Sequence, residues 1–116
     1  MSVVIVFNHP YPKSYCNAIL EAVTTGLHKG RQEVDLIHLN NDRFDPVMTE
    51  ADLKAFVARQ PVDPQVINYI ERLQKAEHLI FIFPIWWDIM PAQTKGFIDR
   101  VLFPGVAYDH HPRGFG

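Results

Sequence analysis

Cysteine is nearly absent from this chain, since Cys16 is the only one among 116 residues. A single thiol excludes a disulfide within the chain and is typical of the reducing cytoplasm, which is the location we predict. An excess of positive charge is lacking too, because eleven Lys and Arg stand against thirteen Asp and Glu. The resulting net charge of -2 argues against nucleic acid as a partner.

Long apolar segments are also missing. The apolar start at residues 3–7 lacks the basic region and the cleavage site of a signal peptide. No apolar run approaches the roughly 20 residues that a membrane-spanning helix needs, so we predict no insertion into a membrane. The glycine-rich motifs of Rossmann and P-loop proteins do not occur, and neither assignment has a motif to support it.

What remains is an alternation of short apolar strands with helices. Residues 3–7, 33–39 and 79–83 are predicted strands, and the first and third are apolar throughout. Helices are predicted at four places with a capping or proline signal: after Ser14, from Thr49 to Arg59, after Asp63 and after Pro91. The apolar face of the first helix is expected at Ala18, Ile19, Ala22, Val23 and Leu27. The pattern predicts a single α/β domain over residues 1–116 with a parallel sheet.

In such sheets ligands bind beyond the carboxyl ends of the strands, which makes the loops after the first and third strands the functional candidates. The first of these loops enters a helix at Ser14, where free main-chain N–H groups and the helix dipole suit a phosphate. His9 and the hydroxyl groups of Tyr11 and Tyr15 add further donors. The alternative is that Ser14 is an ordinary helix cap. Cys16 has no catalytic partners in the pattern and is interpreted as a buried or spectator thiol, not as a nucleophile.

The second loop follows Phe83 and reads PIWWDIMP. Trp86 and Trp87 offer aromatic faces beside main-chain N–H groups that we expect to be free from Ile85 to Asp88, an environment that suits a flat heterocycle. The alternative is that one or both tryptophans are buried in the core or in a dimer interface. The residues alone do not separate the two.

Together, the stretches NHPYPKSYCNA and FPIWWDIMPAQTKGFIDRVLFPGVAY resemble the flavodoxin-like NAD(P)H:quinone oxidoreductase family. That family includes azo- and nitroreductase-like flavoenzymes and accessory proteins of potassium efflux systems, and the resemblance covers the whole chain. It implies a flavodoxin-like three-layer sandwich with strand order 2-1-3, and with the family's fourth and fifth strands missing from this chain.

The resemblance also implies a bound flavin, either FMN or FAD, that takes hydride from NAD(P)H at N5 and passes two electrons to a quinone or similar acceptor. It requires no catalytic side chain, and Lys95, Gly96, Asp99 and Arg100 are expected to be structural. Tyr108 is implied in the substrate pocket. The cofactor-binding residues implied are His9, Ser14, Tyr15 and Cys16 along the phosphate arm, and Pro84, Ile85, Trp86, Trp87 and Asp88 along the ring.

Without further strands, residues 79–83 form an open apolar edge that calls for a partner, so the chain is expected to be a fragment or to form a homodimer. The tract from Asp109 to His111 is interpreted as a solvated tail, and no metal site is expected. Two other functions stay open: an accessory subunit that docks on a membrane transporter, and an inactive, truncated family member.

Overall fold

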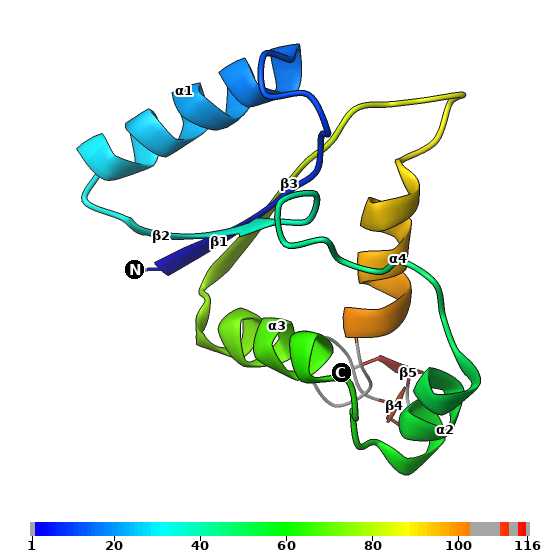
Figure 1. Cartoon of the computed structure of the whole chain (residues 1–116). Coiled ribbons are helices and arrows are strands. Elements are labelled where there is room, and N and C mark those ends of the chain that lie inside the picture. The colour runs from blue at the N-terminus through cyan, green and yellow to red at the C-terminus, as the bar shows by residue number, and fades with distance from the viewer. Residues whose placement is uncertain (1, 103–109, 112–113, 116) are drawn as a thin grey trace.

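The computed structural model describes residues 2–102, 110–111 and 114–115. Its sheet has three parallel strands, β1 (Ser2–Phe7), β2 (Glu33–His38) and β3 (His78–Ile82), in the order β2-β1-β3 (Figure 1). Ile5 in the central strand pairs with Leu36 on one side and Ile80 on the other. The predicted parallel sheet and strand order are confirmed, although β3 lies one residue earlier than expected.

Three of the four helices begin at the caps that the sequence indicated. The helices are α1 (Tyr15–Lys29), α2 (Glu50–Ala58), α3 (Pro64–Lys75) and α4 (Ala92–Val101). Ser14, Thr49 and Asp63 each accept a hydrogen bond from the first turn of α1, α2 and α3 respectively, and Thr49 forms a capping box with Asp52. Pro91 stands in the cap position of α4, where it supplies no side-chain bond.

The helices cover both faces of the sheet (Figure 1). Because side chains alternate along a strand, Val3, Ile5 and Phe7 pack toward α1, whereas Val4 and Val6 pack with residues of α3 and α4. All five side chains are buried. This is the predicted three-layer arrangement, and it places the two candidate loops at the carboxyl end of a rigid sheet.

The predicted apolar face of α1 is partly wrong. Ala18, Ile19 and Ala22 are exposed. The side that packs on the sheet carries Cys16, Leu20, Val23 and Leu27. Both sets fit a helical period, and the small alanines bury little area, so spacing alone did not fix which side of the helix faces inward.

A buried arginine in α4 ties down the long connection between β2 and α3. Arg100 donates from Nε and Nη2 to both carboxylate oxygens of Asp52 at 3.0 and 3.2 Å, and from Nη2 to Asp63 Oδ2 at 2.9 Å. It also donates from Nη1 to the carbonyl of Asp45 at 2.7 Å. Burial alone would raise the pKa of Asp52, but hydrogen bonds from Arg100 and Thr49 outweigh it and lower that pKa. The role of Arg100 in the described contacts is therefore structural, as predicted.

The other α4 residues marked as structural also fit that role. Gly96 lies so close to Pro46 that a Cβ atom there would overlap the proline. Lys95 pairs with Asp99 one turn later in the helix. Apart from the parallel sheet, β4 (His110–His111) and β5 (Gly114–Phe115) form a short antiparallel pair. Within the described ranges, no helix has the length and apolar character needed to cross a membrane.

Candidate functional site

The loop after β1 is closed by side-chain bonds rather than by glycine. Ser14 Oγ accepts from the main-chain N–H of Asn17 at 3.2 Å and from Asn17 Nδ2 at 2.8 Å. Asn17 Nδ2 donates as well to the carbonyl of Tyr11 at 2.8 Å. These bonds hold the loop against the first turn of α1. Sequence reasoning identified Ser14 but missed Asn17, whose position three residues after a cap is the signal that was available.

Capping leaves part of the N-terminus of α1 open. Asn17 and Ala18 donate their main-chain N–H groups to Ser14, whereas among the described residues those of Tyr15 and Cys16 have no protein acceptor. The first turn contains no acidic residue. No acidic side chain in the first turn therefore offsets the helix dipole, and two donors are unpaired among the described residues, an arrangement that suits an anion. Ser14 is thus an ordinary cap, and it leaves the N–H groups of Tyr15 and Cys16 unpaired among the described residues.

The two residues that follow Ser14 differ in what they offer a ligand. The Tyr15 side chain is 82% exposed. The Cys16 side chain is buried against β1 and β3, and burial raises the pKa of its thiol. Only the main chain of Cys16 is thus available to a ligand, in keeping with the spectator interpretation.

The loop after β3 is a tight hairpin, and this corrects one expectation. Trp86 donates its main-chain N–H to the carbonyl of Ile89 at 2.9 Å, and Ile89 donates back to Trp86 at 3.2 Å. Between them, Trp87 and Asp88 both have positive φ, 56° and 61°, as a type I′ turn requires. The N–H of Trp86 is therefore engaged in the turn instead of free. The main-chain N–H groups of Ile85, Trp87 and Asp88 have no acceptor within the described part of the chain.

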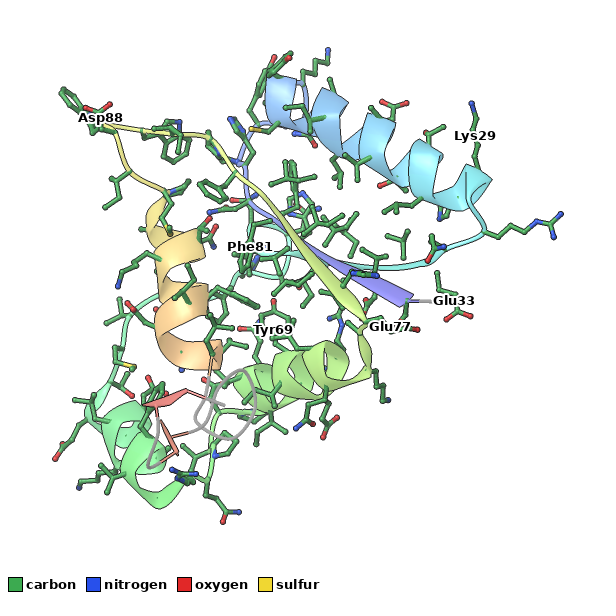
Figure 2. All side chains as sticks on the ribbon, turned by 180° about the vertical axis from the view of Figure 1, so that it is seen from behind. Lys29, Glu33, Tyr69, Glu77, Phe81 and Asp88 are labelled. Carbon is green, nitrogen blue, oxygen red and sulfur yellow. The ribbon has the colours of Figure 1, made fainter. Side chains whose placement is uncertain are left out.

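Neither tryptophan is part of the core. Trp87 is 98% exposed and Trp86 is 44% exposed, and Ile85 and Ile89 beside them are exposed as well. Pro84 is partly buried at the base of the hairpin. Figure 2 shows Asp88 at the far tip of this segment, well away from Phe81 and Tyr69 in the body of the molecule. The hairpin thus presents an apolar, aromatic surface of which Trp87 is almost entirely exposed.

A ring contact joins the two loops. The imidazole of His9 meets the indole of Trp86 edge to face, with 5.9 Å between the ring centroids. His9 Nδ1 accepts from the main-chain N–H of Tyr11 at 3.0 Å, which holds the ring in one orientation. The loop that leads into α1 and the aromatic hairpin are therefore in direct contact.

The last residue of β2, His38, lies at the same edge of the sheet. The ring of His38 packs on Phe7, and its Nδ1 accepts from the main-chain N–H of Asn41 at 3.2 Å. Burial lowers the pKa of His38, although a main-chain hydrogen bond and Asp42 oppose that shift. The lowered pKa favours the neutral form of His38.

Two further residues of the site were missed by sequence reasoning, Asn8 and Thr94. Both are buried, and Asn8 Nδ2 donates to Thr94 Oγ1 at 3.0 Å. A polar residue directly after a buried strand was the signal available for Asn8. Nothing in the sequence connected it with Thr94. Tyr108, predicted to line the substrate pocket, lies outside the described residues.

The whole chain, residues 1–116, matches the protein family described as having a flavodoxin-like fold. The chain belongs to this flavodoxin-like family. The resemblance inferred from the two loops is thereby confirmed.

Relatives of this flavodoxin-like chain include named oxidoreductases. The Escherichia coli K12 protein named uncharacterized NAD(P)H oxidoreductase YcaK is 34% identical over 115 residues, which cover 96% of this chain and 58% of that protein. Mouse ribosyldihydronicotinamide dehydrogenase [quinone] is 31% identical, with 92% of this chain and 53% of that protein covered. The chain spans little more than half the length of these relatives.

Solved structures agree on the fold. The NAD(P)H:quinone oxidoreductase from Methanothermobacter marburgensis superposes with a TM-score of 0.87 at 33% identity, covering 94% of this chain and 57% of that one. An FMN-dependent NADH-azoreductase from Bacillus anthracis, solved in complex with FMN, has a TM-score of 0.67 at 11% identity, covering 99% of this chain and 62% of that one, and shows the fold alone.

Proposed function

We propose that this chain binds a flavin, FMN or FAD, and acts in the reduction of a quinone or similar acceptor by NAD(P)H. The observation that carries the proposal is the contact between His9 and Trp86, which joins an open helix N-terminus to an exposed aromatic hairpin at the carboxyl end of the sheet. A flavin has the matching parts, an anionic phosphate arm and a flat ring with a polar edge. The names of the relatives support the activity.

The residues present fit such a ligand. The main-chain N–H groups of Tyr15 and Cys16 would hold the phosphate, because they are unpaired among the described residues and no acidic residue stands in the first turn. Their hold is electrostatic and needs no lysine or arginine. Ser14 keeps its hydroxyl in the cap and so fixes the direction in which those two donors point.

The hairpin would hold the ring. Its apolar side chains offer contact area, and the N–H groups of Ile85, Trp87 and Asp88 offer donors to the polar edge. When bound, a flavin accepts hydride from NAD(P)H and delivers two electrons to the acceptor. The part of this chain is to orient the ring and to exclude water from one side of it.

We also propose that a second copy of the chain covers the outer edge of β3. No strand pairs with that edge in the described residues. The strand contains no Lys, Glu, Asp or Pro that would protect an exposed edge, since its residues are His78, Leu79, Ile80, Phe81 and Ile82. A hollow of about 260 Å³ lies beside it, lined in part by Leu73, Leu79 and Leu102. An apolar edge of this kind pairs readily with its own copy.

The test separates phosphate recognition from ring recognition. We expect the purified chain to bind FMN at least about tenfold more tightly than riboflavin, which lacks the phosphate. Ser14→Asp keeps a good helix cap but places a carboxylate beside the phosphate, and should weaken FMN binding while sparing riboflavin. Ser14→Asn is the matched neutral control. Titration with FAD identifies the preferred flavin.

Activity is tested on the loaded protein. Anaerobic addition of NADPH or NADH should bleach the flavin absorbance, and menadione, a quinone, should restore it. Failure of the chain to bind any of the three flavins would contradict the proposal. Binding without bleaching would contradict the oxidoreductase part alone.

A further inference from the structure

Asn8 holds both ends of the segment that carries the hairpin. Its main-chain N–H donates to the carbonyl of Ile82, the last residue of β3, at 3.0 Å. Its side-chain Nδ2 donates to Thr94 Oγ1 in the first turn of α4, also at 3.0 Å. Residues 83–93 lie between these two anchor points and include the hairpin. One residue at the end of β1 therefore fixes where this segment leaves the sheet and where it returns.

The residue next to Asn8 contacts the hairpin itself. His9 follows directly in the chain and places its ring against Trp86. In the same turn of α4, Gln93 Nε2 donates to the carbonyls of Leu39 and Phe44 at 3.3 and 3.0 Å, which fastens the start of that helix to the segment after β2. The bond from Asn8 to Thr94 is thus the buried side-chain link between the first loop and α4.

We propose that the hydrogen bond between Asn8 and Thr94 positions the aromatic hairpin relative to the N-terminus of α1, and so sets the geometry in which the flavin is held. This inference rests on the proposed function for the identity of the ligand, and assigns two positioning residues within its site. Asn8 is 3% exposed and Thr94 is 1% exposed, so neither side chain has water as an alternative partner.

The chemistry of the pair explains why it sets a position. A buried amide and a buried hydroxyl stabilise the fold only when they meet at hydrogen-bond distance and angle, because each is costly when unpaired. An apolar pair of similar volume fills the same space without that directional demand. The pair therefore couples the first loop to α4 across 86 residues of sequence.

Three variants test the pair. Thr94→Val removes the acceptor and leaves the Asn8 amide unpaired, whereas Thr94→Ser keeps the hydroxyl and should restore the native behaviour. The double variant Asn8→Leu, Thr94→Val replaces both groups by apolar ones of similar shape, which changes stability little but removes the bond. Thr25→Val makes the same chemical change on the exposed surface of α1 and is the matched control.

The first readout needs no ligand. Hydrogen exchange is measured at the N–H groups of Trp86 and Ile89, which close the hairpin, and at Ile37 in β2. We expect exchange at Trp86 and Ile89 to accelerate about tenfold in the double variant, with exchange at Ile37 unchanged. The second readout is the Kd for FMN, which we expect to rise about tenfold in the same variant and to return in Thr94→Ser.

Each outcome decides the proposal. Unchanged exchange at the hairpin, or equal acceleration at all three positions, would show that the bond has no positioning role. If Thr94→Val does not fold, the double variant carries the test. If the wild-type chain binds no FMN, the proposed function fails, while the exchange measurement still decides whether Asn8 and Thr94 position the hairpin.

Discussion

The ring of His9 lies edge to face against the ring of Trp86, 5.9 Å between centroids, and this contact joins two loops that leave different strands. A double-mutant cycle with His9→Leu and Trp86→Leu should give a coupling of about 0.5–1 kcal/mol in the free energy of unfolding. The same cycle with Trp87→Leu is the control, because Trp87 is almost fully exposed, and should give no coupling. Equal coupling to both tryptophans would disprove a specific contact.

The conformation of Trp87 is strained, and relieving the strain should stabilise the chain. A bulky residue with a φ of 56° costs roughly 1–3 kcal/mol, and its exposed side chain has no packing to lose. Trp87→Gly is expected to raise the free energy of unfolding by about 1 kcal/mol, or Tm by about 4 °C, in thermal denaturation. Asp88→Gly should give a smaller gain, because aspartate tolerates positive φ better than tryptophan. A lower Tm in Trp87→Gly would contradict the strain argument.

Local signals were enough to predict most of the framework. Ser14, Thr49 and Asp63 were identified as caps because capping depends on residues three positions apart. The parallel sheet followed from the alternation of strands and helices, whereas the order of the strands was implied by the resemblance to the flavodoxin-like family. The inward side of α1 was partly mispredicted, because the apolar residues on that helix satisfy a helical period on two sides.

The parts of the site that were missed depend on distant partners or on unusual turn residues. Asn8 meets Thr94 across 86 positions of sequence. No local pattern links such residues before the chain is folded. The hairpin was missed for another reason: Trp87-Asp88 lacks the Asn-Gly or Asp-Gly signal that is typical of a type I′ turn.

The buried side chain of Arg100 should be costly to remove. Arg100→Met keeps most of the side-chain volume but leaves the carboxylates of Asp52 and Asp63 without their partner. We expect a loss of about 3 kcal/mol in the free energy of unfolding, measured by urea denaturation. Lys95→Met, which breaks the more exposed pair with Asp99, should cost less than about 0.5 kcal/mol. Similar losses in the two variants would show that the Arg100 cluster contributes no more than a surface ion pair.

The same cluster predicts how stability changes with acid. The pKa values of Asp52 and Asp63 are lowered below their ordinary value of 3.8 by hydrogen bonds that outweigh the effect of burial. The folded chain therefore binds fewer protons than the unfolded chain as these groups titrate. Their contribution is complete above about pH 5 and is lost as the pH falls through about 4 and below. Urea denaturation between pH 6 and 3 should show this decline, with a smaller slope in Arg100→Met. Equal slopes in the wild-type chain and in Arg100→Met would mean that other carboxylates cause the loss of stability in acid.

The proposed dimer is tested at the open edge of β3, where the second copy of the chain would pair. If a second copy pairs there, light scattering of the wild-type chain should give twice the chain mass of 13.4 kDa. Leu79 is 40% exposed at this edge, so Leu79→Lys places a charge in the interface with little damage to the fold, and should give a monomer. Leu53→Lys changes a leucine of α2 that is also exposed, and should leave the dimer intact. A mass that is unchanged in Leu79→Lys would place any dimer contact elsewhere, and a monomeric wild type would exclude the pairing.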